Sequence, residues 1–296
     1  MKIDTLPALP LNEWEDTKTT LHMWTQIVGK IRLGLTPRVN QWWNVPLHIT
    51  SRGLTTRPMP YKDHSFQIDF DLIDHRLDIV CGGGRTESIE LKPRSVADFY
   101  REVMLALGRL GIEVKIWTMP VEVPDPIPFE KDDQHASYDT EYVDRFWKIL
   151  SQVYYVFREF RSQFTGKCSP VHFFWGSFDL AVTRFSGKPA EPKPGADLIT
   201  RLSYDAELSS LGFWPGSSGI DGPAFYSYTF PEPDGFRDQK VSPAAASYNK
   251  EIGEFLLMYD DVRSLQDPAG AILDFAQSTY EAGARLQGWP IDQFKL

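Results

Sequence analysis

Two arginines, Arg52 and Arg184, occupy matching places in two stretches of the sequence that resemble each other. The stretches run from Gly34 to Trp43 and from Gly166 to Trp175. They align without a gap at a shift of 132 residues (166 − 34), which persists to the arginines. A guanidinium group can hold a carboxylate or phosphate through two parallel hydrogen bonds. If the stretches belong to halves related by a pseudo-twofold axis, the pair predicts a site for an anionic group near that axis. The alternative is that each arginine makes an ordinary structural ion pair.

A second set of chemically capable side chains, Cys168, His172 and Asp179, lies within and just after the second stretch. A cysteine near a histidine can become an activated nucleophile. Cys168 aligns with Thr36, however, and side-chain alternation along an extended strand would put His172 and Asp179 on opposite faces. The pattern therefore favours a buried thiol and a packed histidine. His172 remains a candidate ligand-binding residue.

Acidic residues Asp69, Asp71 and Asp78 alternate along two expected strands. Paired carboxylates can serve acid–base chemistry or bind a hard cation, although this alternation is also typical of a solvated sheet face. The six histidines show no spacing typical of metal ligands. We therefore expect no metal and no cofactor.

The segment 212–228 combines glycines with aromatic residues, including Trp214 and Tyr226. Such a segment can line a ligand pocket or clamp a partner, and it can also plug the open end of a sheet. It lies where the second half is longer than the first. A function confined to one half would therefore be expected here.

Two more tryptophans, Trp43 and Trp175, close the aligned stretches and are also candidate ligand contacts. Strand alternation places Trp43 opposite Arg52 and Trp175 opposite Arg184. Only one of these sets can therefore line a single cavity.

The elements that would position these residues repeat as well. Before each stretch, apolar residues step by three, four or seven, the spacing of one helical face. After each stretch, strand-like alternation leads to a second helix, recognised by Asp98-Phe99 in one half and Asp274-Phe275 in the other. We predict an α+β protein of two pseudo-repeated halves, each helix–antiparallel β-meander–helix, packed into one body.

The expected domain organisation follows the repeat. Residues 1–118 form the first α+β repeat, 119–139 a Pro-rich acidic linker, and 140–296 the second repeat with an insertion. The expected helices are about Glu13 to Leu33, Ser95 to Leu110, Glu141 to Phe164 and Ala269 to Leu286. The expected strands are Trp42 to Ser51, Ser65 to Ile73, Arg76 to Val80, Glu87 to Leu91, Ile112 to Trp117, Val171 to Phe185, Ala224 to Phe230 and Glu254 to Tyr259.

Composition limits the class of protein. The chain has 296 residues, of which 42% are hydrophobic and 24% charged, an ordinary globular profile. A net charge of −9 without a basic run disfavours binding to nucleic acid or an anionic membrane. No apolar stretch is long enough to span a bilayer, and the N-terminus lacks the apolar core of a signal peptide. With only two cysteines, a cytoplasmic location is expected.

Three long phrases, at 21–30, 95–100 and 169–180, resemble a family of uncharacterised bacterial proteins catalogued as domain of unknown function 5996. The resemblance covers nearly the whole chain. It implies a bacterial, cytoplasmic protein and assigns no catalytic residues.

The leading hypothesis is a protein, with or without catalysis, that binds a small anionic metabolite in a pocket between the two halves. The alternative is a noncatalytic interaction or adaptor protein that uses segment 212–228 as its partner surface. The oligomeric state stays open. The expected ligand-binding residues are Arg52, Arg184, Trp43, Trp175, His172, Trp214 and Tyr226.

Overall fold

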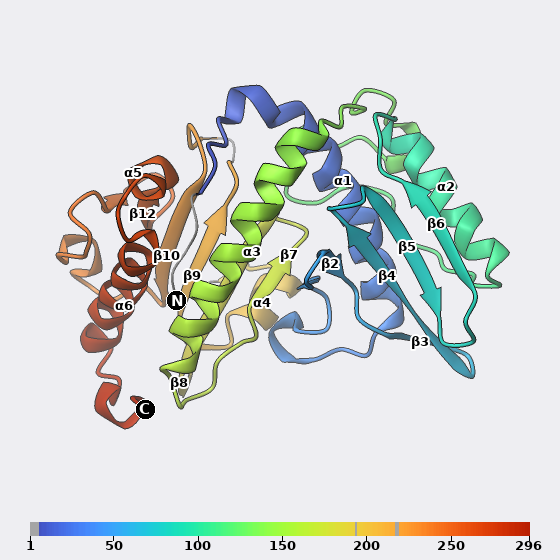
Figure 1. The fold of residues 1–296 in the computed structure, drawn as a ribbon. Helices are drawn as coiled ribbons and strands as arrows, with labels where there is room; N and C mark the ends of the chain where they lie inside the picture. The colour runs from blue at the N-terminus through green and yellow to red at the C-terminus, as the bar shows by residue number, and fades with distance from the viewer. Residues whose placement is uncertain (1–5, 193, 217–218) are drawn as a thin grey trace.

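The computed structural model describes residues 6–192, 194–216 and 219–296, and shows two antiparallel sheets that each carry helices on one face (Figure 1). The helices are α1 (Leu11–Leu35), α2 (Val96–Arg109), α3 (Thr140–Ser162), α4 (Leu198–Ser203), α5 (Tyr259–Arg263) and α6 (Pro268–Leu286). The strands are β1 (His48–Ile49), β2 (Gly53–Thr55), β3 (Met59–Tyr61), β4 (His64–Asp71), β5 (Arg76–Cys81), β6 (Thr86–Glu90), β7 (His172–Phe174), β8 (Asp179–Pro189), β9 (Ala206–Trp214), β10 (Ala224–Phe230), β11 (Ser247–Asn249) and β12 (Glu254–Met258). Short 3-10 helices lie at η1 (Asn40–Trp42), η2 (Phe129–Lys131), η3 (Phe236–Asp238) and η4 (Ile291–Gln293).

The two sheets have nearly the same strand order. The first sheet runs β1-β2-β4-β5-β6, with β3 also paired to β4, and the second runs β7-β8-β9-β10-β12-β11. In chain order each half is therefore a long helix, a β-meander and a second helix. This confirms the predicted α+β fold with two pseudo-repeated halves.

The halves join through their first strands and their helices. Leu47 and Phe173 exchange two backbone hydrogen bonds of 2.9 and 3.0 Å, which bridge the edges of the sheets. The α1 ring of Trp14 packs on the α3 ring of Phe146, with centroids 5.3 Å apart. The two halves therefore form one body.

Each sheet has one face covered by helices, here called the closed face, and one called the open face. In Figure 1, α3 and α6 lie in front of the second sheet, and α1 and α2 lie behind the first. Along β4 the apolar residues Phe66, Ile68 and Phe70 are buried, while Gln67 and Asp69 are only partly buried. This alternation matches the predicted one-sided strand and directs β4's polar residues to the open face.

The predicted strand from Val171 to Phe185 is wrong, because the chain makes a hairpin there. β7 ends at Phe174, β8 begins at Asp179, and Phe178 in the turn takes a positive φ of 56°. The dense apolar residues on both faces suggested a single central strand but belong to two paired strands. Because Asp179 pairs with Phe174 and Ala181 with His172, Asp179 and His172 share the open face. Their predicted placement on opposite faces is therefore also wrong.

Three other strand predictions differ from the structure. The stretch from Trp42 to Ser51 contains only the two-residue β1 after a 3-10 turn, and 112–117 forms no strand. Residues 206–214, partly interpreted as the start of a Gly-rich loop, form β9. Among the described residues, no helix combines the length and apolar composition that a membrane crossing needs.

Candidate functional site

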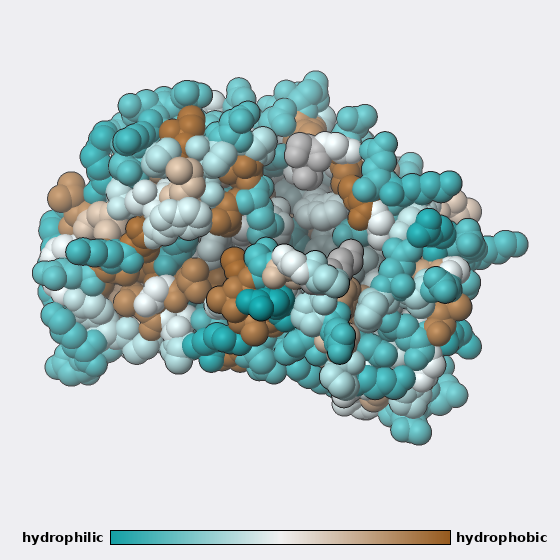
Figure 2. All heavy atoms as spheres, turned by 180° about the vertical axis from the view of Figure 1, so that it is seen from behind, coloured by the Kyte–Doolittle hydropathy of each residue, from teal (hydrophilic) through white to brown (hydrophobic). Residues whose placement is uncertain are grey.

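The open face of the second sheet places large rings beside small side chains. Across β10, β9 and β8, the rows that share this face are Tyr226, Gly212 and Ala181, and then Tyr228, Ser210 and Thr183. Seen from behind, the molecule is hollowed in its middle, and the atoms at the floor of the hollow are pale, which marks intermediate hydropathy (Figure 2). The open face of the second sheet lies on the side of the molecule away from α3 and α6, which is the side that Figure 2 shows.

A tyrosine crosses a strand to reach an aspartate. Gly212 has no side chain, and a Cβ there would overlap the ring of Tyr226. The ring therefore lies across β9, and its hydroxyl donates a hydrogen bond to Asp179 on β8. Ser177 donates a second one to the same carboxylate, at 2.5 Å. Asp179 is only 2% exposed and is held by two hydroxyl donors.

Two further pairs of hydroxyl groups lie on the same face as the Tyr226–Asp179 hydrogen bond. The hydroxyls of Tyr204 and Tyr228 lie 2.9 Å apart, and those of Thr183 and Ser210 lie 3.0 Å apart. Tyr204 follows α4, which packs against η1 at the margin of the first half. Side chains from several parts of the chain therefore meet at this face.

An aromatic stack borders the tyrosines. Trp214 lies over Tyr226 with ring centroids 4.2 Å apart, and Tyr226 lies almost parallel to Tyr228 at 6.2 Å. Ile220 from the β9–β10 connection and Leu256 of β12 pack in the same small apolar cluster, which is separate from the main core. This surface offers ring faces close to polar groups.

Three carboxyl groups gather here without a basic partner. They are Asp179, Glu254 on β12, and Glu122 in the segment between α2 and α3. Among the described residues none of the three forms an ion pair. Gly176 leaves room for Glu122, since a Cβ at 176 would lie 2.7 Å from Oε1 of that residue. The site therefore holds carboxyl groups whose negative charge, when they ionise, the fold does not balance.

The surroundings favour the neutral form of these acids. Burial raises the pKa of Asp179 to about 6, against the hydrogen bonds from Ser177 and Tyr226, and the charge of Glu122 adds to the rise. Burial, followed by the charge of Asp179, raises the pKa of Glu254 to about 8. Desolvation also raises the pKa of Glu122. Carboxyl groups with such values can exchange protons near neutral pH.

A polar stripe on α1 holds the margins of the hollow. Lys18, His22, Gln26 and Lys30 are spaced by four residues and so share one helical face. Each makes a side-chain hydrogen bond to a backbone carbonyl. In order, the carbonyls are those of Gly216, Gly176, Val121 and Met119, at 3.0, 2.8, 2.8 and 2.7 Å. A helix of the first half thus fixes the β9–β10 connection, the β7–β8 turn and segment 119–122 around the second sheet.

Arg52 is committed to neighbouring acids. It lies in the turn between β1 and β2, where its Nε is 2.6 Å from Asp71 and its guanidinium 2.7 Å from Asp74. Its side chain is 47% exposed. This is the structural ion pair that the sequence left open as the alternative.

Arg184 lies on β8 and is 1% exposed. Its guanidinium lies 3.4 Å from the ring centroid of Phe160 and 4.5 Å from that of Tyr280, and it donates to the Phe160 carbonyl. Arg52 is in a turn and Arg184 is within a strand, so the two do not occupy equivalent positions. The aligned arginines therefore form no common anion site.

The other candidates lie in three places. Trp214 and Tyr226 stack together at the hollow. Trp43 and His172 meet nearer the junction of the halves, with ring centroids 6.4 Å apart. Burial lowers the pKa of His172 to about 3, so its ring is neutral at pH 7. Trp175 lies in the β7–β8 turn and donates to the Val45 carbonyl at 3.0 Å, a structural contact.

Cys168 does not form a nucleophilic pair with His172. Burial raises the pKa of its thiol to about 11, which keeps the sulfur protonated at neutral pH. Among the described residues, no group of three or more histidine, cysteine or acidic side chains is placed to hold a metal ion.

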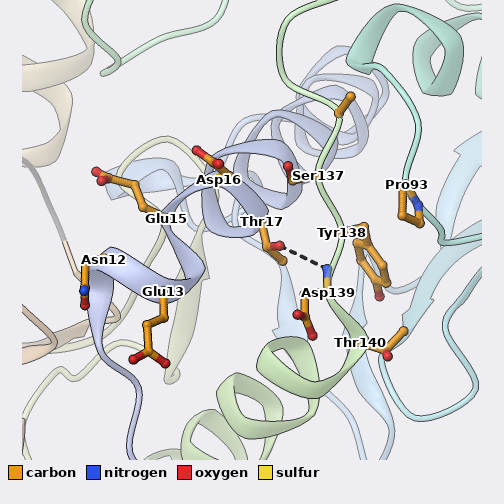
Figure 3. A pocket seen from close by; sticks show the side chains of 11 residues that line it. Asn12, Glu13, Glu15, Asp16, Thr17, Pro93, Ser137, Tyr138, Asp139 and Thr140 are labelled. Atoms are coloured by element: carbon orange, nitrogen blue, oxygen red, sulfur yellow. Dashed lines mark hydrogen bonds between the residues drawn. The ribbon is translucent and has the colours of Figure 1, made fainter.

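Another concavity, of about 730 Å³, lies between the start of α1 and the segment before α3. Its acids Glu13, Glu15 and Asp16 point in different directions, while Thr17 accepts a hydrogen bond from the Asp139 amide at 3.0 Å (Figure 3). Acids are favoured at helix N-termini by the helix dipole. Because its polar groups do not converge, this groove is a weaker candidate than the hollow.

Sequence reasoning missed several residues of the site. Glu122 was assigned to a solvated linker, Glu254 was taken only as the start of a strand, and Asp179 was set aside because the hairpin was not foreseen. Polar residues spaced by four on a helix with a buried face were the available signal for the α1 stripe. The pairing of Tyr226 with Asp179 had no local signal.

Comparison with known proteins places the chain in a family. No curated protein and no solved structure matches it. The family of unknown function DUF5996 matches residues 6–296. Because this match covers nearly the whole chain, as the resemblance of the three phrases implied, the protein belongs to that family.

Proposed function

We propose that the protein binds a small molecule in the hollow on the open face of the second sheet, beside α1. The observation that carries this proposal is the convergence of buried polar groups from distant parts of the chain on one face of the second sheet. Tyr226 with Asp179 and Tyr204 with Tyr228 are the central pairs. An aromatic surface with a few fixed polar groups is typical of a ligand site.

The location keeps one part of the sequence hypothesis, a pocket that needs both halves, because α1 borders the hollow. The ion pairs of Arg52 and the burial of Arg184 give no support to an anionic ligand. The rival hypothesis needs segment 212–228 as an exposed partner surface. Tyr226, on the open face of that segment, is only 5% exposed, which favours the pocket. Ser217 and Ser218 of that segment lie outside the described residues.

A thermal-shift screen of a broad metabolite panel tests the proposal. A ligand that binds only the folded state raises the melting temperature with its concentration. Trp214→Ala removes a ring of the site, and Tyr226→Phe removes the hydroxyl that reaches Asp179. Tyr155→Ala is the control, because Tyr155 is 47% exposed and lies on α3, which covers the closed face of the second sheet.

The expected result is a hit that keeps its shift in the Tyr155 variant, loses it in the Trp214 variant and weakens in the Tyr226 variant. A panel without any hit would contradict binding. So would a hit whose shift survives both site substitutions.

The finer expectations about cell biology remain proposals. A cytoplasmic location is supported by two free cysteines, Cys81 and Cys168, and the expected absence of a nucleic-acid partner by the net charge of −9. A bacterial origin rests on the family resemblance of the sequence alone. Origin of the halves by internal duplication is supported by their shared strand order.

A further inference from the structure

We infer that the ligand carries a positively charged organic group, a protonated amine or a guanidinium, held on the tyrosine and tryptophan rings and against Glu122 and Glu254. This inference rests on the proposed binding site and names the charge of what occupies it. The inferred charge is opposite to that of the anionic ligand suggested by the aligned arginines.

The first support is the charge balance of the site. Glu122, Asp179 and Glu254 have no ion-pair partner among the described residues, and Lys18 at the margin directs its ammonium group to the Gly216 carbonyl. Carboxylates crowded in a low-dielectric setting favour their neutral forms, which agrees with the raised pKa values of Asp179 and Glu254. A cation in the hollow would allow them to ionise and would gain their attraction.

The second support is an orphaned atom. The Oε2 of Glu254 is buried and has no hydrogen-bond partner. Buried polar atoms are nearly always paired, so an unpaired one next to a hollow calls for a donor. An ammonium or guanidinium group offers several N–H donors at once.

The third support comes from the rings. Trp214, Tyr226 and Tyr228 form a stacked row, and the outer face of a tyrosine or tryptophan ring attracts a cation through its quadrupole. The described residues offer no set of three metal ligands, whereas ring faces beside carboxylates suit an organic cation. The arrangement of the rings and the charge of the carboxyl groups therefore both favour an organic cation.

Three probes of similar size separate charge from shape. They are phenethylamine, phenethyl alcohol and phenylpropionate, which are cationic, neutral and anionic at pH 7. Each is titrated at millimolar concentration into the full chain. Binding is measured by thermal shift and by the NMR signal of the Trp214 indole, assigned with Trp214→Ala.

Charge-removing variants complete the test. Glu122→Gln and Glu254→Gln keep the side-chain shape, and each removes one carboxyl group that a bound cation would ionise. Asp69→Asn removes one charge from the open face of the first sheet and is the matched control. Each variant's melting temperature without probe confirms that it is folded.

We expect phenethylamine to bind at least about tenfold more tightly than phenethyl alcohol. Either glutamate substitution should reduce that preference, and Asp69→Asn should leave it intact. Equal or tighter binding of the alcohol or of phenylpropionate at Trp214 would overturn the cation and leave the binding site standing. If phenethylamine does not perturb Trp214, the cation inference is also overturned, and the metabolite panel then decides separately whether the site binds anything.

Discussion

The open faces of the two sheets share a strand order, but two aspartates of the first pair with arginines while the acids of the second have no basic partner in the described part of the chain. On the first sheet, Asp71 pairs with Arg52 and Asp78 with Arg76, at 2.6 and 2.8 Å. Burial would raise the pKa of Asp71, but the hydrogen bonds from Arg52 and nearby backbone amides outweigh it and hold the pKa below its usual value. On the second sheet, Asp179 and Glu254 have no such partner, and their pKa values rise.

The fold itself supplies arginine partners for Asp71 and Asp78, but among the described residues it supplies no basic partner for Asp179 or Glu254. A paired acid on a solvated face needs no functional explanation, because such ion pairs are ordinary features of a folded surface. An unpaired acid beside a hollow costs free energy in the folded state, and structural strain of this kind gathers at functional sites. The contrast between the halves is therefore a better guide to function than their similarity.

The largest expected effect comes from filling the space that Tyr226 occupies over β9. Gly212→Ala places a methyl group where the ring of Tyr226 lies. The substitution should lower the free energy of unfolding by about 3 kcal/mol, because the ring must then move away from Asp179. Urea unfolding measures this. Gly83→Ala is the control, since nothing lies within 4 Å of a Cβ there, and its effect should stay within about 0.5 kcal/mol. Equal effects of the two substitutions would contradict the ring placement.

A smaller effect concerns the pH dependence of stability. Burial raises the pKa of Glu254 from 4.5 to about 8, so the folded protein holds this proton more tightly than the unfolded chain. Its stabilising contribution is present below pH 4.5 and is lost as pH rises to 8. Glu254→Gln should therefore gain about 2 kcal/mol over the original protein between pH 5 and pH 9.

Chemical unfolding at several pH values gives this difference directly. Glu90→Gln is a suitable control, because Glu90 is exposed on β6 and pairs with Lys92 at 2.5 Å. A gain of the same size in both variants, or no pH dependence in the Glu254 variant's gain, would show that Glu254 does not titrate as described.

The smallest effect compares one aspartate from each open face. Asp71→Asn leaves Arg52 without its buried partner and should cost about 1 kcal/mol at pH 8, since the arginine is half exposed. Asp179→Asn removes an unpaired buried charge and should be neutral or stabilising at the same pH. Thermal unfolding of the two variants measures the contrast. The reverse order of stabilities would refute the proposed difference between the faces.

The sequence predicted the fold better than the site because its strongest signals are periodic. Helical spacing before each stretch and alternation along β4 led to correct elements. The predicted strand from Val171 to Phe185 failed because apolar residues on both faces resemble a central strand, while the turn depends on the backbone of Phe178. That single error moved Asp179 to the wrong face.

The site depends on contacts between residues far apart in the chain. Tyr226 and Asp179 are 47 positions apart, and Gln26 and Val121 are 95 positions apart. No local pattern encodes such pairs. The aligned arginines, in contrast, were conspicuous in sequence, yet Arg52 serves a turn and Arg184 is buried among rings.

A carboxyl-carbon NMR titration of the full chain tests the central contrast most directly, with signals assigned by Asp71→Asn, Asp179→Asn and Glu254→Gln. The account predicts that Asp179 titrates near pH 6 and Glu254 near pH 8, while Asp71 titrates below 3.8. If Asp179 and Glu254 both titrated at their ordinary values, the second open face would not disfavour their ionised forms. The electrostatic case for a ligand site there would then be lost.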